Sequence, residues 1–257
     1  MKENKPISLL ACLMVLGLAL AGVATQAAEA PPPLILETFA CNYNDGQDID
    51  DLLSARDYMV KQADKAGVTL APSYLWSRYK GGVDFDTIWF TLHESLAAFA
   101  AEGEAFRTAP ELAGVDAKFD PVATCESNIS TAQVVFQGSE AGPPGGSSFI
   151  QSNACMFRNG ADADDIADFA NHLSDVLGNI SAYNSTTFVT ATPITSGPNS
   201  ADIYLFSVND SQSAWAASRT AFQASDGGAA LIRHFNTILD CNASLWFSQQ
   251  VVGDTDG

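Results

Sequence analysis

The sequence predicts an α+β fold built from two copies of one unit, each with the order strand, helix, strand, strand, helix, strand. The main observation is a repeat: residues 40–52 return 114 residues later as residues 154–166, with Ala, Cys, Gly and an Asp-x-Asp-Asp triplet at identical spacing. Cys125 likewise matches Cys241 at an offset of 116. Three further positions follow that second offset, namely Glu94, Phe99 and Phe106, which match Asp210, Trp215 and Phe222. Chance does not produce such agreement, so the chain contains an internal duplication.

The chain begins with a pattern typical of a signal peptide, which we expect to span residues 1–27. Lys2 and Lys5 precede an uncharged apolar run over residues 7–24, and small residues follow up to Ala27. A retained membrane anchor is the alternative, because the run is nearly long enough to span a bilayer. The Ala-rich end and the prolines at 31–33 favour cleavage near Ala27. We therefore expect a periplasmic or secreted protein.

The charge balance is strongly acidic. The full sequence has 12 basic and 30 acidic residues; cleavage removes Lys2, Lys5 and Glu3, which leaves 10 basic and 29 acidic residues and a formal charge of −19. Nucleic acid and anionic membrane surfaces would repel such a chain. We expect no nucleic-acid partner, and no membrane partner after cleavage.

The cysteines predict two disulfides. Cleavage removes Cys12 and leaves Cys41, Cys125, Cys155 and Cys241, an even number in an oxidising compartment, for which three pairings are possible. The repeat favours the symmetric pairing of Cys41 with Cys125 and of Cys155 with Cys241. Metal binding is the rival interpretation, but no His or second Cys lies at ligand spacing near any of them.

Hydrophobic periodicity and turn residues place the elements of each half. In the first half we expect strands at 34–41, 73–79, 87–93 and 128–136, and helices at 48–66 and 94–106. In the second half we expect strands at 149–155, 186–192, 203–208 and 245–252, helices at 162–177 and 210–223, and a short extra helix within 225–239. The predicted repeats are residues 34–137 and 148–252, separated by a Gly- and Pro-rich linker at 138–147.

This order of elements resembles the ferredoxin-like fold. Two such units in one chain resemble the dimeric α/β-barrel superfamily, in which paired sheets face each other, although the resemblance is topological and no motif of a named enzyme is matched. It implies that the last strand of each unit lies antiparallel beside the first, so that each predicted disulfide falls where these two strands meet. Because duplication supplies the second unit within the chain, we expect a monomeric pseudo-dimer.

Acidic clusters stand at the start of the first helix of each half. Asp48, Asp50 and Asp51 recur as Asp162, Asp164 and Asp165, beside a glycine in each case. Calcium binding is one interpretation, but the ligand spacing of an EF-hand loop is absent. Helix capping explains them more simply, because Asp48 and Asp162 are well placed as N-caps. We predict no metal site.

The strand faces suggest a candidate site in the first half. Ile88, Phe90 and Leu92 form an apolar face that we expect to pack against the helices. Trp89, Thr91 and His93 would then point into the space between the sheets. On the neighbouring strand, Ile35, Glu37 and Phe39 would point the same way.

Glu37 and His93 would then share a cavity walled by Phe39 and Trp89. The matching positions of the second half carry Gln151, Asn153 and Asn209. A carboxylate near an imidazole in an apolar pocket can act as an acid and base pair. The alternative is that both are satisfied polar groups at the rim of a packed interface. Trp76 and Arg78 lie on a strand whose inward face the pattern does not assign.

Three functions remain open. The first is a protein that binds a small, partly apolar molecule between its two repeats. The second is an enzyme using that cavity, since the resemblance implies cofactor-independent oxygenases or haem-handling proteins. The third is a structural or partner-binding secreted protein. Only His93 is placed to serve as an axial haem ligand, since His172 and His234 have no partner at informative spacing, and we predict no cofactor. Nucleophile motifs, phosphate-binding glycine loops and zinc motifs are missing.

Overall fold

The computed structural model describes residues 32–142, 146–195, 197 and 200–253. The predicted signal peptide and residues 143–145 of the predicted linker lie outside the described residues.

The first repeat consists of β1 (Leu34–Tyr43), α1 (Ile49–Ala66), β2 (Ser73–Gly81), β3 (Thr87–His93), α2 (Leu96–Thr108), η1 (Pro110–Leu112), α3 (Asp116–Phe119) and β4 (Ala123–Gln137). The second consists of β5 (Ser147–Phe157), α4 (Ala163–Gly178), η2 (Ser181–Tyr183), β6 (Thr186–Pro193), β7 (Ile203–Asn209), α5 (Gln212–Ala224), α6 (Asp226–Ile238) and β8 (Leu239–Val252). The predicted α+β fold is confirmed.

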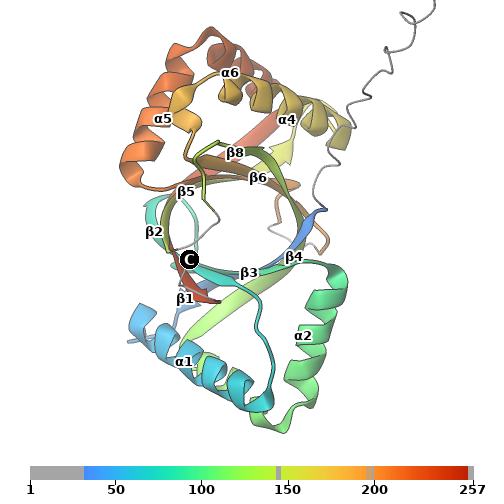
Figure 1. Ribbon diagram of the computed structural model, residues 1–257, viewed down its shortest axis with the longest axis vertical. Helices are drawn as coiled ribbons and strands as arrows, with labels where there is room; N and C mark the ends of the chain where they lie inside the picture. Colours follow the sequence, from blue (N-terminus) through green and yellow to red (C-terminus); the bar gives the residue numbers. More distant parts are fainter. Residues whose placement is uncertain (1–31, 143–145, 196, 198–199, 254–257) are drawn as a thin grey trace, which may run out of the picture. The chain divides into compact units, whose positions relative to one another are not determined.

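The strands form one closed antiparallel barrel with the order β1-β3-β2-β8-β5-β7-β6-β4. Each repeat contributes a four-stranded sheet, and the two sheets join edge to edge where β2 pairs with β8 and β4 pairs with β6. In Figure 1, α1 and α2 cover the barrel on one side, and α4, α5 and α6 cover it on the opposite side. This is the architecture of a dimeric α/β barrel within one chain, as predicted.

Aspartate caps begin the first helix of each repeat. The Asp48 side chain accepts a hydrogen bond from the backbone N–H of Asp50, and the Asp51 side chain accepts one from the N–H of Asp48. Asp162 and Asp165 form the same reciprocal pair at the start of α4. The capping interpretation is confirmed. Within the described ranges, no group of three or more His, Cys, Asp or Glu side chains is arranged to hold a metal ion.

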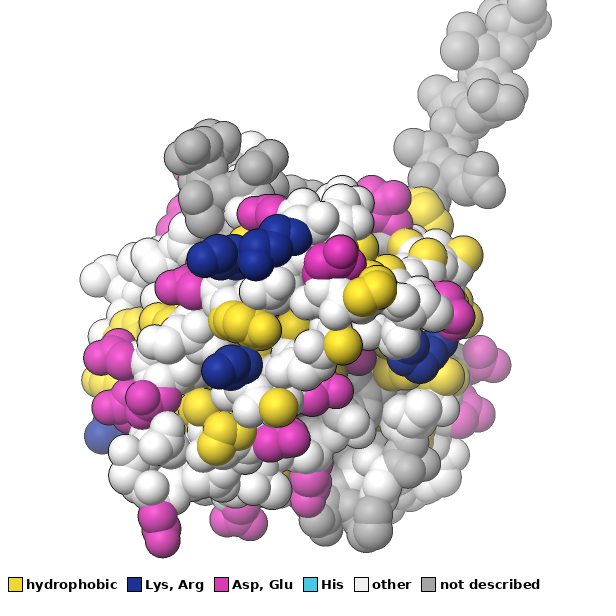
Figure 2. Space-filling model, turned by 90° about the horizontal axis from the view of Figure 1, so that it is seen from below, with side chains coloured by type: hydrophobic (Ala, Val, Ile, Leu, Met, Phe, Trp, Pro, Cys, Tyr) yellow, Lys and Arg dark blue, Asp and Glu magenta, His cyan; other side chains and the backbone are white. Residues whose placement is uncertain are grey.

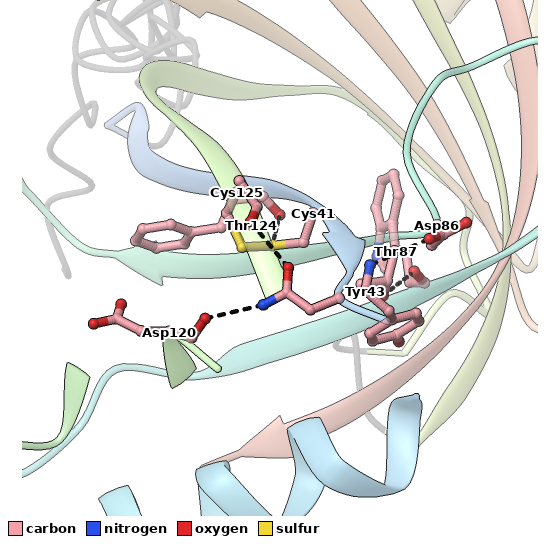
Figure 3. The surroundings of a disulfide bond; sticks show 10 residues. Cys41, Tyr43, Asp86, Thr87, Asp120, Thr124 and Cys125 are labelled. Carbon is pink, nitrogen blue, oxygen red and sulfur yellow. Dashed lines mark hydrogen bonds between the residues drawn. A yellow bond between two sulfur atoms is a disulfide. The ribbon is translucent and has the colours of Figure 1, made fainter. Parts of the chain in front are cut away.

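Both predicted disulfides are present. Cys41 in β1 lies directly opposite Cys125 in β4, with an S–S distance of 2.07 Å, and Cys155 in β5 lies opposite Cys241 in β8, with 2.08 Å. Figure 3 shows the first bond joining the two strands beside Thr124. Each bond ties the first strand of a repeat to its last strand, as the symmetric pairing requires.

Aromatic side chains fill the interior of the barrel. Trp76 on β2 and Phe90 on β3 meet Phe206 on β7, with ring centroids 5.3 Å and 5.9 Å apart respectively. Trp246 on β8, which is fully buried, completes this group. Since β3 and β7 belong to different repeats, these contacts cross the barrel. The space between the repeats is therefore a packed core.

The prediction for the strand faces was wrong. Phe90 belongs to the barrel interior, with Ile88 and Leu92 packed against the same cluster. Trp89 lies on the outer face, in the cluster that contains Leu52 of α1. The reason is that a closed barrel has an interior as apolar as its helix-covered exterior, so alternation alone does not tell the two faces apart.

The surface seen in Figure 2, from the side of α1 and α2, carries acidic side chains spread over the whole face with fewer basic ones among them. This agrees with the net charge of −18 for the full sequence. None of the described helices is both long and apolar enough to cross a bilayer.

Candidate functional site

The structure brings Glu37 and His93 together. The Nε2 atom of His93 lies 3.5 Å from Oε2 of Glu37, and its Nδ1 atom lies 3.7 Å from Oε2 of Glu102 in α2. The His93 side chain is 2% exposed, and the ring of Phe99 packs edge-on against it at 5.3 Å. The imidazole is thus enclosed between two carboxylates, beneath α2 and outside the barrel.

Burial shapes the protonation of this cluster. Loss of solvent raises the pKa of Glu102 above its ordinary 4.5, and the charge of Glu37 raises it further. The backbone N–H of Ala71, which donates to the Glu102 carboxylate at 3.0 Å, and the nearby His93 act in the opposite direction. Glu102 therefore ionises at a higher pH than an exposed glutamate does.

Phe39 and Trp89 do not wall a cavity beside this cluster. Trp89 packs against Leu52 of α1 and meets the ring of Phe119 at 6.2 Å, while its indole N–H donates to Thr91 Oγ1 at 3.2 Å. Phe39 packs against the same cluster. Both side chains belong to the core between the sheet and α1.

The second repeat places its predicted residues at equivalent positions. Gln151 lies opposite Ser207 just as Glu37 lies opposite Thr91, and Phe149 lies opposite Asn209 just as Ile35 lies opposite His93. Asn209 is 1% exposed. Its amide donates to the backbone oxygens of Phe149 and Ser207, and its oxygen accepts from Thr186 Oγ1 at 3.0 Å. Asn209 is therefore a satisfied core residue.

A pocket lies in the second repeat, between the outer face of its sheet and the helices α4, α5 and α6. Its volume is about 180 Å³. The apolar wall includes Phe169, Leu173, Phe188, Leu205, Phe222 and Leu231. Most of these side chains come from helices and strands of one repeat, so the pocket does not lie between the repeats.

One side of the pocket is polar. The indole N–H of Trp215 donates to Gln151 Oε1 at 2.9 Å, and the Gln151 amide donates to Asn153 Oδ1 at 3.3 Å. The Asn153 amide in turn donates to the backbone oxygen of Leu205 at 3.3 Å. Of the three site residues predicted in the second repeat, Gln151 and Asn153 thus line the pocket. Asn209 does not.

The helices contribute pocket residues that the strand pattern did not point to. Trp215, Ser218 and Arg219 come from α5, and Tyr183 comes from η2. The repeat offset contained a signal for the first of these, since Trp215 matches Phe99, which packs on His93. Applying that offset to the helices would have found Trp215.

Substitutions between the repeats explain why this space is open in one and filled in the other. In the first repeat Trp89 pairs with Phe39 across two strands. In the second repeat the equivalent pair is Leu205 and Asn153, so two smaller side chains replace two large rings. Ser218 takes the position of Glu102 at the offset of 116. The corresponding space therefore holds the cluster of Glu37, His93 and Glu102 in the first repeat and an open pocket in the second.

Trp76 and Arg78 lie apart from both places. Trp76 points into the barrel interior, where it packs against Phe90 at 4.0 Å. Arg78 forms an ion pair with Asp86 at 3.3 Å near the end of β2. Neither residue lines the pocket.

Comparison with known proteins identifies the fold. No protein-family model matches the chain, and no curated protein sequence matches it. A candidate monooxygenase from Fusobacterium nucleatum subsp. nucleatum matches with a TM-score of 0.54 and 15% identity, over 89% of this chain and 96% of that chain. A candidate chlorite dismutase matches with 0.52 and 11%, over 87% and 96%. An anthrone oxidase-like protein matches with 0.50 and 15%, over 88% and 96%. At such identities these structures share the fold alone.

Proposed function

We propose that the protein binds a small, mostly apolar molecule in the pocket of the second repeat. The observation that carries this proposal is the pocket itself, with apolar side chains around most of it and a few polar groups on one side, as is typical of ligand sites. Its volume of about 180 Å³ suits a molecule of one or two rings, since an engineered apolar cavity of roughly 150 Å³ binds benzene.

The proposed site differs from the one that the sequence suggested. The ligand was expected between the repeats, where Trp76, Phe90 and Phe206 instead form a packed core. The two disulfides are typical of proteins in oxidising compartments. Together with the predicted signal peptide, they support binding in the periplasm or outside the cell.

Leu205→Trp tests the proposal, because Trp is the residue that fills the equivalent space in the first repeat. Isothermal titration calorimetry with 2-naphthamide, a neutral two-ring probe, should show binding to the unmodified protein and at least about ten-fold weaker binding to the variant. Leu205→Met, which keeps volume and polarity, is the matched control and should bind normally. Absence of binding to the unmodified protein would favour a structural or partner-binding role instead.

A second candidate function is an oxygenase-like reaction in the same pocket. Two of the matched structures carry the names monooxygenase and anthrone oxidase-like protein, which supports this candidate at the level of the fold. Naphthalene-1,4-diol, a two-ring hydroquinone that oxygen oxidises slowly, is a probe of the size that suits the pocket. An enzyme would accelerate oxygen uptake with this probe in the unmodified protein but not in the Leu205→Trp variant, whereas a binding protein would give the same slow rate in both.

Haem does not fit the residues present. The pocket lining contains no His, Cys or Met, and burial raises the pKa of its Tyr183 to about 12, which disfavours a phenolate ligand. His93 is enclosed by side chains, and His172 and His234 are exposed outside the pocket. A porphyrin is also much larger than the pocket. Titration with haem should therefore produce no Soret shift.

A further inference from the structure

Arg219 is a cation at the pocket without an anionic partner. It lies on α5, is partly buried, and lines the pocket. Within the part of the chain that the structure describes, its guanidinium forms no ion pair and no side-chain hydrogen bond. Four of the other arginines, Arg56, Arg78, Arg107 and Arg158, each pair with an aspartate or glutamate, and the fifth, Arg233, is exposed.

This lack of an ion pair is unusual for a partly buried cation in this chain. Among the described residues, the other cations without an ion pair are all exposed, namely Lys61, Lys65, Lys80, Lys118 and Arg233, whereas the partly buried Arg56 is paired. Removing a guanidinium from water without a partner is unfavourable. Such a charge beside an apolar pocket is explained if its partner is supplied by a ligand.

A tyrosine near Arg219 also favours the binding of an anion. Tyr183 is 4% exposed, lines the same pocket, and is close enough for the Arg219 charge to affect its ionisation. Because burial raises the pKa of Tyr183 to about 12, the phenol keeps its proton and remains a hydrogen-bond donor. A charged guanidinium and a neutral phenol, which interacts with the Ser218 side chain, thus stand at one pocket.

The comparison between repeats supports a link between this charge and the pocket. At the offset of 116, Arg219 corresponds to Gly103, which lies on α2 in the first repeat, where the equivalent space is filled. The guanidinium therefore occurs only in the repeat that contains the pocket. Its position is not a general feature of the repeated unit.

We propose that the ligand is a small aromatic or otherwise flat monocarboxylate, whose apolar body fills the pocket and whose carboxylate pairs with Arg219. The planar guanidinium matches the two oxygens of a carboxylate better than an ammonium does. This inference rests on the proposed binding function and adds the chemical class of the ligand.

A matched ligand pair tests it. Calorimetry with 2-naphthoate and with 2-naphthamide compares a carboxylate with its neutral amide on the same ring system. The unmodified protein should bind 2-naphthoate more tightly by roughly ten- to a hundred-fold. Arg219→Gln should bring the two affinities to within about two-fold of each other, while Arg219→Lys should keep part of the preference for 2-naphthoate.

Arg233→Gln is the control for a general charge effect. Arg233 is exposed on α6, does not line the pocket, and forms no ion pair within the described residues. Its replacement removes the same charge and should leave both affinities unchanged. The inference is overturned if Arg219→Gln alters neither affinity, or if Arg233→Gln weakens 2-naphthoate binding equally. If the unmodified protein binds neither probe, the proposed function itself fails.

Discussion

His93 in β3 and Asn209 in β7 occupy the same position in the two repeats, and both are buried. Asn209 is satisfied by neutral hydrogen bonds to its own sheet. His93 instead faces two carboxylates, and its Nε2 atom forms no hydrogen bond within the described structure. The repeats have thus diverged at this position, where one holds an imidazole between two carboxylates and the other a hydrogen-bonded amide.

His93→Asn should destabilise the first repeat without affecting the pocket. The substitution removes the imidazole that lies between Glu37 and Glu102 and leaves two partly buried carboxylates without it, at a cost of roughly 1–3 kcal/mol. Urea unfolding measures the loss. The combination Glu37→Gln, His93→Asn and Glu102→Ser, which copies the second repeat, should recover part of it. Weakened 2-naphthamide binding in His93→Asn would show that the cluster serves the ligand after all.

The raised pKa of Glu102 predicts a pH dependence. Below about pH 4.5 the carboxyl is protonated in the folded and the unfolded chain. As the pH rises, the unfolded chain ionises first, so the contribution of Glu102 to stability is lost as the pH passes the folded-state pKa. The free energy of unfolding of the unmodified protein, relative to Glu102→Gln, should therefore fall as the pH rises above about 4.5. A difference that stays constant or rises would contradict this.

Each disulfide should contribute similarly to stability. The bonds join residues separated by 84 and 86 positions, so the double variants Cys41→Ser/Cys125→Ser and Cys155→Ser/Cys241→Ser should each lose about 2–4 kcal/mol. Chemical denaturation of both variants measures this. Non-reducing peptide mapping should find only the symmetric pairs, and a peptide linking Cys41 to Cys155 would disprove the pairing.

The mature chain should be a monomer. The two sheet edges of each repeat are already paired with the other repeat, through β2 with β8 and β4 with β6, so no edge of the barrel remains open. Sedimentation velocity should give one species with the mass of a single chain. An obligate dimer at micromolar concentration would argue against this.

Much of the fold could be predicted from the sequence, because each half of the duplication gave independent information on the same arrangement of elements. The duplicated Cys and Asp positions identified the disulfides and helix caps that the structure contains. The last strands were harder: β4 and β8 begin at Ala123 and Leu239, five and six residues before the predicted 128 and 245. Polar residues are frequent in both segments, with Thr124, Glu126 and Ser127 in β4 and Asp240 and Asn242 in β8, and pairing with β1 and β5 overrides that composition.

The site was less predictable, for two physical reasons. A closed barrel buries both faces of its strands, so the alternation around Trp89 is compatible with either orientation. A pocket also forms where a large side chain is replaced by a smaller one, as where Leu205 takes the position of Trp89. In addition, its lining includes helix residues such as Arg219, which the strand pattern does not place. The pairing of Glu37 with His93 was predictable, because neighbouring strands fix it; its place beneath α2 was not.

The most direct test of the account uses the four tryptophans of the chain. Trp215 lines the pocket, Trp89 lies in the core of the first repeat, and Trp76 and Trp246 lie inside the barrel. In a titration of ¹⁵N-labelled protein with 2-naphthamide, the indole N–H resonance of Trp215, assigned with Trp215→Phe, should shift while the other three stay in place. Shifts of Trp76 and Trp246 with Trp215 unchanged would place the ligand between the repeats and contradict the proposed site.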